Sequence, residues 1–74
     1  MVSTFAEHLK EQRIKHHKTL QSASIDTGLP LSTISDYEHD RHDASLFNAT
    51  VLADYFNVSL DYLVGRTGKN DKRN

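Results

Sequence analysis

Histidine and acidic residues gather in two segments where metal or catalytic chemistry would first be sought. His16 and His17 are adjacent, and residues 39–43 read His-Asp-Arg-His-Asp. Adjacent side chains on a helix point about 100° apart, so the first pair cannot chelate a metal as residues four apart would. The second segment has plausible ligand spacing but lacks a further ligand cluster. We therefore expect solvated loop histidines and no metal site.

Catalytic groups and cofactor motifs are also missing from the sequence. No nucleophile, base and orienting group are arranged for catalysis, and Gly28, Gly65 and Gly68 do not form a phosphate-binding loop. The absence of cysteine excludes a disulfide framework and suits the cytoplasm. We expect no catalytic residues, no cofactor and no enzymatic activity.

A small polar helix face is the better candidate for chemistry. With Ile34 facing inward, a rotation of 100° per residue brings Leu31, Tyr37 and Glu38 within about 60° of it. Three residues point the opposite way, and two more lie on the flanks: Ser32, Asp36 and His39, then Thr33 and Ser35. This exposed face suits recognition of a partner better than packing.

Two helices are expected before this face. Thr4 and Glu7 have capping-box spacing, which predicts a first helix over residues 4–16. Thr19 can cap a second helix that Gly28 would end, because glycine tolerates the left-handed backbone after a helix. A turn over residues 28–30 and a recognition helix over about 31–39 complete a helix-turn-helix.

Two further helices are expected after the polar loop. Ser45 can cap a fourth helix, and Asn57 fits the turn that follows it. Ser59 can cap a short last helix that Gly65 closes. The fourth helix carries a stripe of apolar residues expected to be buried: Ala49, Leu52, Ala53 and Phe56. The prediction is an all-α, compact five-helix domain.

Charge divides the chain unevenly. The net charge is −1, but residues 1–65 carry five basic and nine acidic residues, a net of −4. Residues 66–74 carry four basic and one acidic residue, a net of +3, and lack apolar residues. We expect one domain over residues 1–65 and a flexible basic tail over 66–74. No apolar stretch approaches the roughly twenty residues that span a membrane.

Two segments at the right separation resemble the lambda-type repressor and Cro family of phage and bacterial regulators. Residues 28–38 read Gly-Leu-Pro-Leu-Ser-Thr-Ile-Ser-Asp-Tyr-Glu, similar to the family's glycine turn followed by Ser-Thr-Ile-Ser and an aromatic-Glu pair. Residues 52–63 are similar to the family's Leu-Ala, Leu-Gly-Val-Ser and Leu-Leu ending. The resemblance implies a lambda-repressor-like fold, an operator in double-stranded DNA and, often, a homodimer.

The resemblance also assigns roles to individual residues. It implies that Arg13 and Glu38 form a structural ion pair, and both charges lie on apolar faces, where only a paired charge is tolerable. The base contacts carried over by position are Leu31, Ser32, Thr33 and Asp36. The positions expected near the DNA backbone are Thr19, Leu20, Arg41 and His42.

Several departures from the family pattern leave a second function open. Leu20 stands where the family commonly has a phosphate-binding Gln, and Ala23-Ser24 replaces Leu-Ala. Residues 31–44 carry four acidic residues against Arg41 alone, whereas most non-specific affinity for DNA comes from cations. The first hypothesis is a sequence-specific DNA-binding regulator. The alternative is an antirepressor or repressor modulator whose acidic face binds a partner repressor's DNA-binding domain.

Overall fold

The computed structural model describes residues 3–66, and all of its regular elements are helices. The five helices are α1 (Thr4–Lys15), α2 (Leu20–Thr27), α3 (Leu31–Glu38), α4 (Leu46–Tyr55) and α5 (Leu60–Leu63). The predicted all-α, five-helix architecture is confirmed. Residues 67–74 of the predicted tail lie outside the described residues. Within residues 3–66, no helix is long and apolar enough to cross a membrane.

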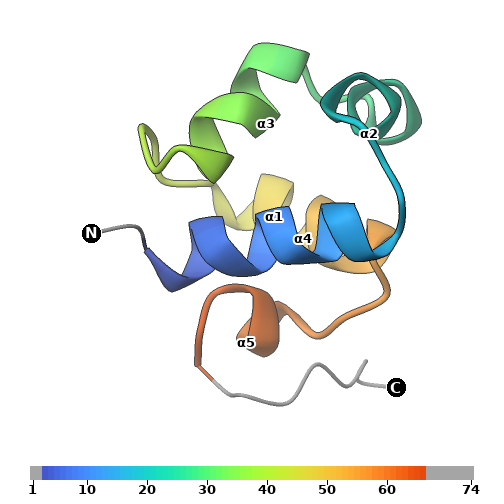
Figure 1. Cartoon of the computed structure of the whole chain (residues 1–74). Coiled ribbons are helices and arrows are strands. Elements are labelled where there is room, and N and C mark those ends of the chain that lie inside the picture. The colour runs from blue at the N-terminus through green and yellow to red at the C-terminus, as the bar shows by residue number, and fades with distance from the viewer. Residues whose placement is uncertain (1–2, 67–74) are drawn as a thin grey trace.

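Helix α1 lies at the centre of the arrangement. Figure 1 shows α2 and α3 on one side of α1 and the short α5 on the other, with α4 packed behind. Contacts join α1 to both α3 and α5, and α4 contacts α2 and α5. Helix α3 is therefore supported by α1 and α2 while its outer side stays uncovered.

Side-chain caps begin four of the helices. Ser3, and not Thr4 as predicted, caps α1: its backbone is extended (φ −69°, ψ 158°) and its hydroxyl accepts from the amide of Ala6 at 3.2 Å. Thr4 already has helical geometry and cannot serve as the cap. The other three predicted caps are confirmed: Thr19, Ser45 and Ser59.

A residue in the left-handed conformation follows or ends each helix. His17, Asp40 and Asn57 have φ of 57°, 58° and 57° after α1, α3 and α4. Gly28 and Gly65 have φ of 80° and 88° after α2 and α5, as the sequence predicted for these glycines. After α3, the amide of Asp40 donates to Tyr37 O at 3.2 Å and that of Arg41 to Asp36 O at 2.8 Å. This pair of bonds is a Schellman motif.

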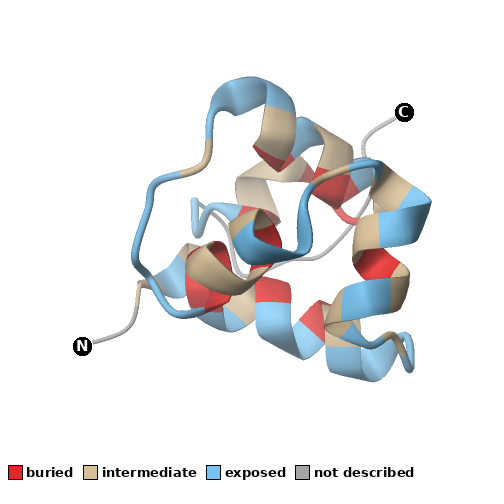
Figure 2. Cartoon of the chain, turned by 90° about the horizontal axis from the view of Figure 1, so that it is seen from above, coloured by how far each residue is buried: buried red, intermediate tan, exposed pale blue. Residues whose placement is uncertain are grey.

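The core forms where the inner faces of the helices meet (Figure 2). The predicted stripe of α4 is fully buried, including Phe56, which follows the end of the helix. Its neighbours in the main cluster come from α1, α3, the α4–α5 turn and α5: Leu9, Tyr37, Val58 and Leu63. Helix α2 contributes one buried side chain, Ala23. The core is small, and α2 is held largely by other contacts.

The structure corrects two details of the predicted recognition helix. Helix α3 ends at Glu38 with His39 as its C-cap, one residue before the predicted end. Leu31 does not face inward: it is 44% exposed, whereas Ile34 is 1% exposed. Leu31 stands in the first turn of α3, beyond the reach of the core that covers the later turns.

Candidate nucleic-acid interface

Side-chain bonds fix the turn between α2 and α3. Ser24 Oγ donates to Leu29 O at 2.6 Å, and Thr27 Oγ1 donates to Ala23 O at 2.7 Å. The Thr27 hydroxyl also accepts from the amide of Leu29 at 3.2 Å. The sequence identified Ala23-Ser24 as a departure from the family's Leu-Ala, but not that Ser24 would brace the turn. These bonds orient α3 relative to α2.

The outer side of α3 presents the residues predicted to contact bases. Leu31 and Ser32 are exposed, and Thr33 and Asp36 are partly exposed. Ile34 and Tyr37 are buried on the opposite side. The first turn of α3 therefore offers short polar groups and one apolar side chain to a partner.

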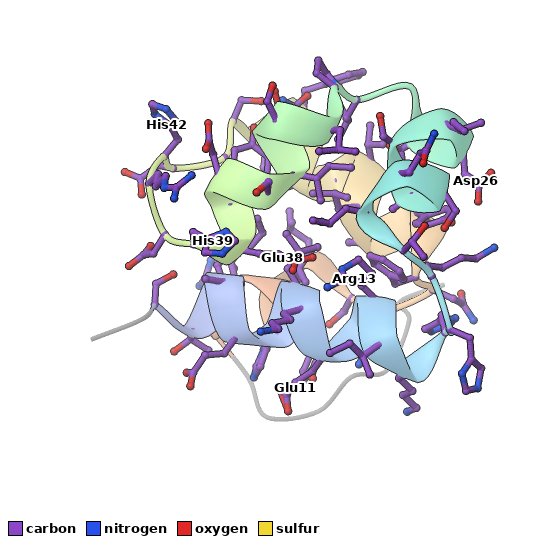
Figure 3. The ribbon with its side chains drawn as sticks, turned by 45° about the horizontal axis from the view of Figure 1, so that its top comes forward. Glu11, Arg13, Asp26, Glu38, His39 and His42 are labelled. Atoms are coloured by element: carbon purple, nitrogen blue, oxygen red, sulfur yellow. The ribbon has the colours of Figure 1, made fainter. Side chains whose placement is uncertain are left out.

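Arg13 and Glu38 lie between α1 and α3 and point toward each other (Figure 3). Arg13 Nε donates to Glu38 Oε2 at 2.7 Å, and its NH2 group donates to Oε1 at 3.1 Å. Their side chains are 15% and 3% exposed. The third guanidinium nitrogen of Arg13, NH1, donates to Lys18 O at 2.8 Å. One guanidinium thus joins α1, the α1–α2 turn and α3.

The last turn of α3 is also tied to α4 and α1. Asn48 Nδ2 donates to the Tyr37 hydroxyl at 2.9 Å. The Tyr37 ring packs edge-on against Phe5, with centroids 5.7 Å apart. Neither contact was predicted from the sequence, because the two partners come from elements whose relative placement only the fold sets.

Two eight-residue helices joined through the left-handed Gly28 have the geometry of a helix-turn-helix. A family model described as Helix-turn-helix matches residues 9–63, most of the chain. The chain belongs to the Cro/C1-type helix-turn-helix family. No curated protein and no solved structure gives a significant match. Membership places this helix-turn-helix protein among DNA-binding regulators, which are typically non-enzymatic.

The two predicted backbone contacts at the start of α2 have different roles in the helix-turn-helix. Thr19 Oγ1 accepts from the amide of Ser22 at 3.0 Å, and Ser22 Oγ accepts from the amide of Thr19 at 2.9 Å. This reciprocal pair is a capping box. Leu20 begins α2 and is partly buried. Thr19 therefore positions the first helix of the motif, and its hydroxyl is already engaged there.

The two predicted backbone contacts after α3 lie beside an acidic residue. Arg41 NH1 is 3.4 Å from Asp36 Oδ1, and His42 Nε2 is 3.6 Å from Asp36 Oδ2. The carboxylate of Asp40 has a different partner: its Oδ2 accepts from the amide of Ser3 at 3.2 Å. The structure thus brings together three predicted DNA-contacting residues, and it neutralises charge within that group.

A further polar cluster, missed in the sequence, connects α2 to α4. Tyr55 donates its hydroxyl proton to Asp26 Oδ2 at 2.5 Å, and Lys18 Nζ lies 3.4 Å from the same oxygen. The Tyr55 hydrogen bond, and then Lys18, lower the pKa of Asp26. Burial, followed by the bond to Asp26, raises the pKa of Tyr55. The bond to Asp26 also raises the pKa of Lys18. This cluster supports α2, whose apolar contribution is small.

The histidines do not assemble a metal site in the described part of the chain. Among residues 3–66, no three His, Cys, Asp or Glu side chains are grouped to hold a metal ion. His39 Nδ1 lies 2.8 Å from Ser35 O. His8 stacks on Tyr62 with ring centroids 4.1 Å apart, and its Nδ1 lies 2.6 Å from Tyr62 O. Both rings have structural contacts within the protein.

Proposed function

We propose that this protein is a sequence-specific transcription regulator of the Cro or repressor type, acting in the cytoplasm of a bacterial or phage-infected cell. It reads the major groove with α3 while α2 crosses the DNA backbone. The observation that carries the proposal is the uncovered first turn of α3, a helix held by the Gly28 turn before it and by the Arg13–Glu38 pair at its last residue. A recognition helix needs such support, since its side chains must meet base edges in one register.

The proposed base contacts follow from the chemistry of the exposed residues. Leu31, 44% exposed, can meet a thymine methyl group, and Asp36 can accept from a cytosine amino group. The hydroxyls of Ser32 and Thr33 can bond several base edges and discriminate weakly. We expect the strongest base preference opposite Asp36.

The proposed contacts with the DNA backbone have two roles: one pair of residues positions the motif, and the other pair approaches phosphate. Thr19 and Leu20 at the start of α2 place the motif on the duplex, and Leu20 can offer only apolar cover to the sugar-phosphate chain. Arg41 and His42, both exposed after α3, can approach a phosphate. Arg41 supplies the permanent positive charge of this set.

We further propose that the regulator acts as a homodimer on a two-fold operator. A chain of 74 residues has a small core and gains from a partner subunit. Val64, after α5, is partly exposed at 38%, so it and the neighbouring Leu60 offer apolar surface for a second copy. A two-fold dimer would contact half-sites roughly 34 Å apart, one turn of DNA.

Fluorescence anisotropy with random-sequence duplex DNA tests the main proposal. We expect binding at low salt and a marked loss of affinity between about 50 and 200 mM salt. A sequence pool would then yield an operator whose affinity falls on Ser32→Ala and Thr33→Ala. Absence of binding even at the lowest salt would reject the DNA-binding function for the isolated chain.

The acidic balance of residues 31–44 favours one second candidate, an antirepressor or repressor-modulating protein. Asp36, Asp40 and Asp43 lie in this segment with Arg41 as its only Lys or Arg. Leu31, at the start of α3, is 44% exposed. Such a face fits the basic DNA-binding surface of a partner repressor. Titration with a basic repressor domain distinguishes the two functions, because a regulator would bind duplex DNA and leave that domain unbound.

A further inference from the structure

The turn that ends α3 places Arg41 beside Asp36 of the recognition helix. The Schellman bonds of Asp40 and Arg41 turn the chain back at the end of the helix. The amide of Arg41 donates to Asp36 O at 2.8 Å, so the backbone itself fixes residue 41 beside residue 36. The side-chain contact between them is therefore prearranged by local structure.

The carboxylate of Asp36 has a cation candidate on each oxygen. Arg41 NH1 lies 3.4 Å from Oδ1, and His42 Nε2 lies 3.6 Å from Oδ2, where it forms an ion pair when protonated. The Asp36 side chain is 27% exposed, against 62% for Arg41 and 69% for His42. In the described chain no other acid forms an ion pair with Arg41 or His42. The two residues are open to solvent on their outer sides and held by Asp36 on their inner sides.

We propose that Asp36 is a specificity-determining residue that restrains Arg41 and His42 from binding DNA phosphate non-specifically. This inference rests on the proposed DNA-binding function. A phosphate group and the Asp36 carboxylate compete for the same guanidinium donors. Because the ion pair is exposed and its distances are long, phosphate can displace the carboxylate once the carboxylate has another partner.

Base recognition supplies that partner. A cytosine amino group in the major groove donates to an acidic side chain. When Asp36 accepts from such a group, the base competes with Arg41 for the carboxylate, and this competition weakens the ion pair so that Arg41 can bind the adjacent phosphate. On other sequences the carboxylate keeps Arg41 and repels the nearby DNA charge. A correct base pair is thereby coupled to one backbone contact, which widens the affinity ratio between operator and random DNA.

The test compares Asp36→Asn with Asp43→Asn in the full chain. Both substitutions remove one negative charge from the same region, but Asp43 is exposed and has no ion pair in the described structure. The readout is binding to random-sequence duplex between about 50 and 200 mM salt. Circular dichroism of both variants checks that the helices remain folded.

We expect Asp36→Asn to bind random duplex several-fold more tightly than Asp43→Asn. Its slope of log affinity against log salt should be steeper by about one, the value for one additional phosphate contact. Adding Arg41→Gln to Asp36→Asn should return the slope to that of the wild type. Asp36→Asn should also lose preference for cytosine in a selected operator.

The outcomes separate this inference from the proposed function. Binding by the wild type, with equal affinity and slope in the two variants, overturns the restraint while leaving the DNA-binding function intact. Tight binding by Asp36→Asn alone, with none by the wild type or Asp43→Asn, supports the restraint. If none of the three binds duplex at the lowest salt, both the restraint and the DNA-binding function are rejected.

Discussion

Arg13 and Glu38 form a two-bond fork that joins the first and third helices across a largely buried interface. The donor–acceptor distances are 2.7 and 3.1 Å, and Glu38 is almost fully buried. The NH1 group of Arg13 donates to Lys18 O, which fixes the path of the chain into α2. One side chain of α1 thus contacts both α3 and the turn that leads into α2, and so helps to position the two helices of the DNA-binding motif.

Loss of one partner of this pair should destabilise the fold strongly. Glu38→Gln leaves the Arg13 charge without a counter-charge in a largely dry site, which costs about 3 kcal/mol in the free energy of unfolding. Urea denaturation followed by circular dichroism measures the change. The double variant Arg13→Met with Glu38→Leu should lose less than Glu38→Gln alone, because no unpaired charge remains buried. A double variant less stable than the single one would contradict this account.

The left-handed residue after α4 should respond to side-chain size in a predictable direction. Asn57 has φ 57°, a conformation that costs an alanine about 1 kcal/mol. Asn57→Ala is expected to lower the midpoint of urea denaturation, while Asn57→Gly is expected to maintain or raise it. Thr50→Gly, at an exposed position inside α4, serves as the control. Thr50→Gly should lower the free energy of unfolding by about 0.4 kcal/mol, the difference in helix propensity between threonine and glycine, so equal effects of glycine at the two positions would refute the prediction.

The Asp26 cluster should make stability depend on pH at the acidic end. The pKa of Asp26 is lowered from its ordinary value of 3.8, first by the Tyr55 hydroxyl. Because the pKa of Asp26 is lower in the folded state, the ionised carboxylate contributes fully to stability above pH 3.8. That contribution disappears as the pH falls through the lower pKa of the folded state. The stability difference between wild type and Asp26→Asn should therefore be present at neutral pH and shrink in strong acid. Asp43→Asn, whose exposed carboxylate is unpaired in the described structure, should show no such trend.

The same cluster should also make stability depend on pH in the alkaline range, through Tyr55. Burial, with the bond to Asp26, raises the pKa of Tyr55 above 10.0. Its contribution to stability is complete below 10.0 and is lost as the pH rises through the higher folded value. Titration of phenolate absorbance should contain a late step from Tyr55, and Asp26→Asn should move that step to lower pH. An unchanged titration curve would show that Asp26 does not act on Tyr55.

Two glycines should differ in how much an added methyl group costs. Both Gly28 and Gly65 have left-handed backbones, with φ of 80° and 88°. A Cβ at Gly28 would meet nothing within 4 Å, whereas one at Gly65 would lie 2.7 Å from Thr4 Cγ2. We expect Gly28→Ala to cost about 1–2 kcal/mol from the backbone alone, and Gly65→Ala to cost more. Thermal melts that rank them in the opposite order would contradict the contact with α1.

The sequence by itself determined the features that act over a few residues. Three caps, Thr19, Ser45 and Ser59, were predictable because a hydroxyl bonds an amide two or three positions along the chain. The ends at Gly28 and Gly65 follow from the backbone freedom of glycine. The stripe on α4 follows from helical periodicity. These local signals were enough for five helices and a helix-turn-helix, and the resemblance to the family implied the contact between Arg13 and Glu38.

Only the structure decided the backbone torsions at the ends of the helices and the contacts between side chains of different elements. Ser3 rather than Thr4 caps α1 because the backbone enters the helix one residue earlier than the capping pattern suggested. Leu31 is exposed because the core does not extend to the first turn of α3. The pairing of Asp36 with Arg41 depends on the left-handed Asp40, whose conformation reverses the chain. The bond from Tyr55 to Asp26 depends on how α4 packs against α2. Such contacts are set by the relative positions of helices and by loop torsions, which residue type and spacing do not specify.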